Sequence, residues 1–297
     1  MKPCNCATTF SNTGTPSCML AIKDTRKLII VPTYGSDGSL NKIAAGDTLN
    51  QTYFDNKINA VDPLDRWYPL PLLKYVEDTK AENNYETPPD GSKIFVSEGI
   101  RSFKAAFMFT SITFLSNLKA FGCNKISVFE IDADTNLIGS TDGTDFYPRK
   151  VADQTFTSML QKAKVKTEIG KIMIGFDIDE TEEDEDLSII TSTEADCDFM
   201  LLNGLLDTNI AISGVGATAF TATMTLDFGT FKTKDPDVGH EKADFALDKS
   251  GTPVTITSVT ESTDGVYTFV VPTCTGAHTL TFNKAGWAIT TATVTFP

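Results

Sequence analysis

The clearest pattern along the chain is a strict alternation of apolar and polar residues between positions 171 and 178. The apolar residues that fall on one face of this segment are Ile172, Ile174, Phe176 and Ile178. The opposite face carries Lys171, Met173, Gly175 and Asp177. Because a period of two residues is typical of a strand with one buried face, the pattern predicts a strand that borders a core.

A block of acid follows this strand directly. Eight of the ten residues from 177 to 186 are Asp or Glu. Beyond Asp177 they are Asp179, Glu180, Glu182, Glu183, Asp184, Glu185 and Asp186. Three interpretations fit the block: a solvated loop that protects a strand edge, an acidic surface that repels an anion, or a divalent cation site.

Other segments extend the same β-rich pattern. Short apolar runs predict strands at 26–34, 93–112, 125–132 and 219–231, and the last of these alternates almost perfectly. Helical spacing and capping residues predict short helices at 113–122, 153–163 and 195–207. The sequence therefore predicts a mainly β fold with one to three short helices.

Residues 41–92 form a long polar stretch with five prolines. Its aromatic and basic residues include Arg66, Trp67, Tyr68, Tyr75 and Tyr85. Long loops without secondary structure are uncommon inside compact domains and are usually functional. Two interpretations stay open: the loop docks on a neighbouring subunit, or it folds back on its own domain.

Changes in composition suggest four parts. Residues 1–24 are rich in small polar residues and are interpreted as an extended N-terminal arm, followed by a β domain over 25–231. A charged linker spans 232–242. Residues 243–297 contain short Thr- and Val-rich strands with turn signals at regular spacing, which predicts a small β-sandwich of immunoglobulin type.

Charge and cysteine usage limit the classes of function. The 297 residues carry a net charge of −14, which argues against a protein that grips nucleic acid by neutralising phosphates. The chain has no apolar run long enough to cross a bilayer and no leader-like start. Cys4, Cys6 and Cys18 lack a nearby fourth zinc ligand, so free thiols are favoured over a metal site.

The sequence offers little for catalysis. Its two histidines, His240 and His278, lie in the linker and in the small C-terminal domain, and no nucleophile motif accompanies them. The DADTN segment at 132–136 departs from a calcium loop at its required Gly and Glu positions, so a hairpin turn is favoured. We therefore predict no enzyme, cofactor or metal.

Residues 10–231 resemble the major tail (tail tube) proteins of tailed bacteriophages. The resemblance rests on NTGTPSCML before RKLIIVPTY, on GIRSFKAAF, on NLIGS before FYPRK, on FDIDETEEDEDLSII and on LLNGLLD. It implies a β-sandwich or half-barrel with a flanking helix. Six copies would close into rings, and rings would stack into a tube in the virion tail, assembled in the host cytoplasm with other tail proteins.

The resemblance also implies roles for the segments above. One face of the alternating strand would line the lumen or a neighbouring subunit, and the aromatic loop would join rings. Double-stranded DNA would pass as a cargo that does not adhere, and the immunoglobulin-like domain would decorate the outside. Two alternatives remain: another virion component, such as a capsid decoration, connector or baseplate protein, or a carbohydrate-binding attachment module that uses Trp287.

Overall fold

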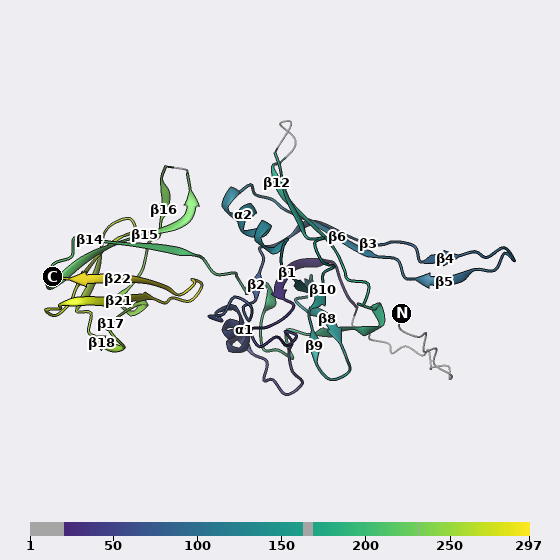
Figure 1. The fold of residues 1–297 in the computed structure, drawn as a ribbon, viewed down its shortest axis with the longest axis horizontal. Helices are drawn as coiled ribbons and strands as arrows, with labels where there is room; N and C mark the ends of the chain where they lie inside the picture. The colour runs from purple at the N-terminus through teal and green to yellow at the C-terminus, as the bar shows by residue number, and fades with distance from the viewer. Residues whose placement is uncertain (1–20, 163–168, 231) are drawn as a thin grey trace.

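A computed structural model describes residues 21–162, 169–230 and 232–297 (Figure 1). Within these residues 46% lie in strands and 10% in helices, so the predicted mainly β fold is confirmed. Most of the predicted N-terminal arm at 1–24, including its three cysteines, lies outside the described residues. The remaining cysteines, Cys123, Cys197 and Cys274, are free thiols.

The first half of the chain forms two antiparallel sheets that pack face to face. The path of the first sheet runs β13 (Leu187–Ile190), β8 (Leu137–Thr141), β7 (Ile126–Asp132), β1 (Thr25–Pro32) and β2 (Tyr68–Pro69), with β10 (Arg149–Lys150) on β7 and β9 (Phe146–Tyr147) on β8. The second sheet runs β11 (Thr157–Gln161), β12 (Lys171–Asp177), β6 (Arg101–Phe107) and β3 (Lys74–Lys80). We call this second sheet the β12 sheet.

The core between the two sheets contains the apolar face predicted from the alternation. Ile172, Ile174 and Phe176 of β12 are buried there, and the ring of Phe176 stacks on Phe103 of β6 at 5.0 Å. Each fully buried side chain of this size stabilises the fold by about 1.5–3 kcal/mol. The predicted half-buried strand is therefore confirmed.

Strand β1 is buried on both faces. Leu28 and Ile30 point into the core between the sheets, while Ile29 and Val31 point into a second core on the other side. This second core is covered by α1 (Gln51–Ile58) and by the segment around Phe199. The uninterrupted apolar run of the sequence is explained by this burial on both faces.

Two predicted helices are wrong. In place of the helix expected at 153–163, the described residues contain strand β11 (Thr157–Gln161), whose Leu160 packs on the core between the sheets while Met159 points outward. Pairing with β12 supplies the hydrogen bonds that a helix would have made internally. Residues 195–207 contain no α-helix but one turn of 3₁₀-helix at Phe199–Leu201, because the segment must turn to bury Phe199 and Leu202 together.

The third predicted helix is confirmed with a shifted start. Helix α2 spans Ile112–Phe121 and is capped by the Ser111 side chain, not by Thr113. The predicted turn after β7 is also present. The buried Asp132 carboxylate accepts hydrogen bonds from the backbone amides of Asp134 and Asn136, both at 2.9 Å, and the chain returns as β8.

The segment predicted as a long loop at 41–92 has structure throughout much of its length. It contains α1, β2, β3 and β4 (Asn84–Glu86). Beyond β3 and β6 the chain continues as a two-stranded ribbon of β4 and β5 (Ile94–Ser97) that projects far from the body (Figure 1). We call residues 81–100 the projecting hairpin. A Cβ atom at Gly99 would lie 1.8 Å from the Ala81 carbonyl oxygen, so the two strands approach closely only with glycine there.

The second half of the chain forms another β-sandwich. One sheet runs β14 (Thr208–Ser213), β15 (Ala219–Gly229), β20 (Val266–Val270) and β19 (Ser258–Thr263), with β16 (Lys234–Pro236) on β15. The other runs β18 (Thr252–Val254), β17 (Phe245–Lys249), β21 (Gly276–Phe282) and β22 (Thr290–Phe296). This C-terminal sandwich and the projecting hairpin lie at opposite ends of the molecule (Figure 1).

The predicted boundary at 243 and the linker at 232–242 are corrected by this arrangement. Strand β15 was assigned to the first domain, but Phe220 stacks on Phe269 of β20 at 4.6 Å. The domain therefore begins near Thr208, and the supposed linker contributes β16 and the buried His240. Local alternation predicts the strand β15 but does not reveal that its partner lies more than 40 residues further along the chain.

We predict that a fragment of residues 204–297 unfolds cooperatively, whereas a fragment of 243–297 does not. The shorter fragment lacks Phe220, Ala222 and Met224, which form one wall of the C-terminal core. Thermal circular dichroism and amide NMR dispersion measure the difference. In the complementary pair, residues 1–240 should bind more of a hydrophobic dye than residues 1–203, because both keep the projecting hairpin but only the longer fragment exposes the apolar face of β15; equal dye binding would contradict the new boundary.

Candidate assembly surface

The four residues predicted on the polar face of the alternating strand share one outer face. Lys171, Met173, Gly175 and Asp177 are half-exposed on the side of the β12 sheet away from the core. Asp177 accepts a hydrogen bond of 2.6 Å from Ser102 Oγ on β6, and the Lys171 ammonium lies 5.0 Å from the centre of the Tyr75 ring. The sheet therefore presents a broad outer surface of mixed polarity.

The β12 sheet also ends in two edge strands. β3 and β11 each pair with one neighbour within the described part of the chain. Met159 on β11 has 59% of its surface exposed. An edge strand presents unpaired backbone groups to which another strand can be added.

The acidic turn at 179–186 lies at the root of the projecting hairpin, not on the outer face of the sheet. Asp184 binds Lys80 of β3 at 2.8 Å and Arg101 of β6 at 3.3 Å. Glu182 lies 3.8 Å from Lys150 of the first sheet. The turn thus joins both sheets to the strands that carry the hairpin.

The pKa values of two acidic residues in the turn are shifted in opposite directions. Partial burial opposes ionisation of Asp184, but the hydrogen bond from Lys80 and the charge of Arg101 together hold its pKa below the ordinary value. A hydrogen bond with Glu183 and the negative charge of that residue raise the pKa of Glu185. One carboxylate therefore braces the turn, while in the neighbouring Glu183–Glu185 pair the protonated form of Glu185 is favoured.

Three of the five residues predicted as an inter-ring contact belong instead to their own domain. Trp67 is 1% exposed and packs against Phe129 at 5.1 Å between ring centres. Arg66 donates to the Ala60 carbonyl at 2.8 Å, and Tyr68 OH donates to the Pro63 carbonyl at 3.0 Å. These contacts favour the folding-back interpretation, most clearly for Trp67, which is buried in its own domain.

The other two, Tyr75 and Tyr85, are exposed, and Tyr85 lies on the projecting hairpin beside further apolar side chains. These side chains have between 45% and 55% of their surface exposed: Tyr85, Ile94, Phe95, Val96 and Ile100. Sequence reasoning identified 93–112 as strand but missed this patch. The signal available was the apolar triplet IFV directly after a Pro- and Gly-containing turn.

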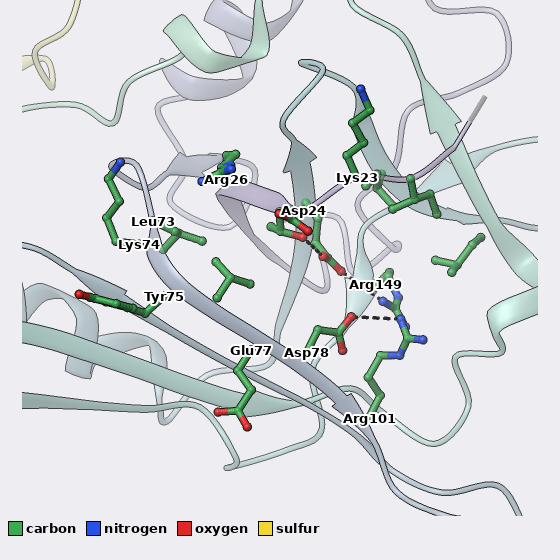
Figure 2. Close-up of a pocket in the computed structure, with 16 residues that line it drawn as sticks. Lys23, Asp24, Arg26, Leu73, Lys74, Tyr75, Glu77, Asp78, Arg101 and Arg149 are labelled. Atoms are coloured by element: carbon green, nitrogen blue, oxygen red, sulfur yellow. Dashed lines mark hydrogen bonds and ion pairs between the residues drawn. The ribbon is translucent and has the colours of Figure 1, made fainter. Parts of the chain in front are cut away.

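A pocket of about 530 Å³ opens near the hairpin root (Figure 2). It is lined by β1, β3, β6 and β10 and by the chain that enters β1. Arg149 is deeply buried in its wall and forms an ion pair with Glu130 at 3.2 Å. Glu130 also accepts a hydrogen bond of 2.6 Å from Thr25 Oγ1. Arg101 binds Asp78 of the neighbouring strand at 3.4 Å at one end of the pocket.

The histidine expected in the linker is sealed inside the C-terminal sandwich. His240 Nε2 lies 2.9 Å from Asp237, and its Nδ1 lies 3.2 Å from the Lys284 ammonium. Trp287 packs edge-on against His240 at 5.5 Å, with Lys284 over its face. The cluster fastens the turn before β22 to the core of the C-terminal sandwich.

Comparisons with known proteins add no further assignment. No protein-family model, no curated protein and no solved structure matches this chain. Among the described residues, no helix has the length and apolar character needed to span a membrane. No group of three or more His, Cys, Asp or Glu side chains in that part of the chain is arranged to hold a metal ion.

We predict that Asp184→Asn loosens the hairpin root and lowers the free energy of unfolding by about 0.5–1 kcal/mol, as for other partly exposed ion pairs. Hydrogen exchange of the β3 and β6 amides should accelerate most. Glu180→Gln, in the same turn but without an ion pair among the described residues, is the control.

The wild-type brace should also depend on pH. Because the folded pKa of Asp184 is depressed, its stabilisation is complete above the pKa of the unfolded chain. It is lost as the pH falls through the folded pKa. The quantity to compare is the protection factor of the β3 amides, which corrects for the intrinsic pH dependence of exchange. Protection factors that stay constant through this acidic range, or that change equally in Asp184→Asn, would contradict the assignment.

Proposed function

We propose that the protein is a self-assembling structural subunit of the tail tube class, whose copies close into rings that stack into a tube for DNA. The observation that carries the proposal is the projecting hairpin, which extends far from the body and leaves five large apolar side chains exposed along its length (Figure 1). An isolated two-stranded ribbon is marginally stable in water. Exposed apolar patches of this kind mark interaction sites, so a second copy is the expected cover.

The β12 sheet supplies a means of ring closure. Its edge strands β3 and β11 can be paired between neighbouring copies, which would join the sheets into a continuous wall and remove their open edges. The outer face with Lys171, Met173, Gly175 and Asp177 would then line the lumen or a subunit contact. Both roles need a face that is accessible in the single chain, and this face is accessible.

The charge of the chain supports DNA as a cargo that does not adhere. A net charge of −14 per copy disfavours the counterion release that makes DNA binding tight. The acidic turn lies at the hairpin root, where one ring would meet the next. In this proposal its negative charge would repel DNA at the junction between rings. Lys80, Arg101 and Lys150 neutralise part of it.

The C-terminal sandwich has its own core and lies at the end of the molecule opposite the hairpin. This placement supports a role as a decoration on the outside of the assembly. Neither the hairpin nor the sheet edges depend on it. Assembly as another virion component would use the same hairpin but would not produce stacked rings.

We predict that the double variant Ile94→Ser/Phe95→Ser folds normally but assembles poorly. Neither residue belongs to a core cluster, so monomer stability should be retained. Loss of two apolar contacts should raise the protein concentration needed for assembly by about tenfold or more. Negative-stain microscopy and sedimentation velocity measure both properties.

The matched control is Val61→Ser/Leu64→Ser, which removes two exposed apolar side chains from a loop on the body. It should assemble like the wild type. Wild-type protein that stays monomeric at millimolar concentration would overturn the proposal. Assembly that is unaffected by the hairpin variant would refute the role of the hairpin.

A further inference from the structure

We infer that the pocket at the hairpin root binds a carboxylate from the projecting hairpin of a second copy. The inference rests on the proposed self-assembly and goes beyond it by naming the receiving site. The pocket is built for such a group because it combines two guanidinium groups with an apolar wall. That wall is formed by Ile22, Leu73, Val76, Ile138 and Leu187.

The guanidinium groups in the pocket are incompletely satisfied. Arg149 has a side chain that is 3% exposed, and Glu130 is its one ion-pair partner among the described residues. The Nε atoms of Arg149 and Arg101 are buried, and neither has a hydrogen-bond partner in that part of the chain. Arg101 also binds Asp78 and Asp184, so the deficit lies at the Nε donors, and an added oxygen ligand at the guanidinium groups would be favoured.

The two arginines reach the pocket from different strands. Arg101 comes from β6 and Arg149 from β10, and both side chains point toward the same end of the cavity (Figure 2). Five basic and four acidic residues line the pocket. It is therefore slightly positive on a molecule that is strongly negative overall, and guanidinium forks match the planar geometry of a carboxylate.

The projecting hairpin carries the complementary chemistry. Residues 81–98 contain four acidic residues and one lysine, next to the exposed apolar side chains. Glu98 is bound to Lys80 at the base, whereas Glu82 and Glu86 have no ion pair within the described residues. The same short segment thus offers carboxylates for the arginines and apolar side chains for the pocket wall.

Geometry requires the two partners to belong to different copies. The hairpin points away from its own root, so its tip cannot reach the pocket beside that root (Figure 1). Docking of a tip on the root of another copy is a heterologous contact, in which two different surfaces meet. Contacts of this type propagate into rings or stacks instead of closing as dimers.

Photo-crosslinking in the full-length protein tests the inference. Tyr75 lines the pocket and is 70% exposed, so p-benzoylphenylalanine at position 75 samples the space above it. A mixture of ¹⁴N- and ¹⁵N-labelled protein separates crosslinks between copies from those within one chain. We expect crosslinks between copies from position 75 to residues 81–98, and none of this kind from position 34, an exposed tyrosine that does not line the pocket.

Charge variants on the hairpin test the chemistry without disturbing the core. Glu86→Gln, which lies further out on the hairpin than the base residues Glu82 and Glu98, should lower the yield of this crosslink at least about threefold, the effect expected from losing partly exposed ion pairs. Lys93→Gln, on the same hairpin but of opposite charge, should leave the yield unchanged or raise it. Equal yields in all three proteins would overturn the carboxylate assignment.

The result also separates this inference from the proposed function. If rings or tubes form but position 75 crosslinks to a segment outside 81–98, the inference fails and the proposed function stands. If neither assemblies nor crosslinks between copies form, both fail. Crosslinks to the hairpin tip that inorganic phosphate suppresses as strongly as Glu86→Gln does would support a site that binds an anionic group.

Discussion

The structure of the first domain depends on the burial of one strand on both faces. β1 contributes Leu28 and Ile30 to the core between the sheets and Ile29 and Val31 to the core beneath α1, so two hydrophobic clusters share a single backbone. With about 1.5–3 kcal/mol for each buried side chain, this strand links the stability of both layers. Its position also fixes the β12 sheet, because that sheet is held by packing against the first sheet and its strands extend beyond the core to form the projecting hairpin.

Strand β1 also buries a charged side chain, Lys27, whose hydrogen-bond partners are backbone carbonyl groups. It is 1% exposed, and its ammonium binds the carbonyls of Met200 and Leu202. Burial lowers the pKa of Lys27 to about 8. The lysine satisfies carbonyl groups that the 3₁₀-turn leaves free at its end, which explains how residues 199–202 cover the second core without a regular helix.

Local patterns in the sequence predicted much of the fold, and their failures have a common cause. The alternation at 171–178 and at 219–229 identified two strands because each buries one face. The helix expected at 153–163 failed because Phe156 and Leu160 satisfy helical spacing and strand alternation equally, and pairing with β12 decided between them. The predicted domain boundary was wrong for the same reason, because β15 pairs with β20, which lies far along the chain and leaves no local pattern.

The candidate surface was predictable in part. The sequence placed Lys171, Met173, Gly175 and Asp177 on one face, but it could not distinguish the buried Trp67 from the exposed Tyr85 in a segment where both are aromatic. The acid run likewise has two roles that composition cannot separate. Asp184 and Glu182 bind cations of the two sheets, whereas a hydrogen bond with Glu183 and the charge of that residue raise the pKa of Glu185. Composition alone therefore does not show which carboxylates pair with cations of the two sheets and which lie against one another.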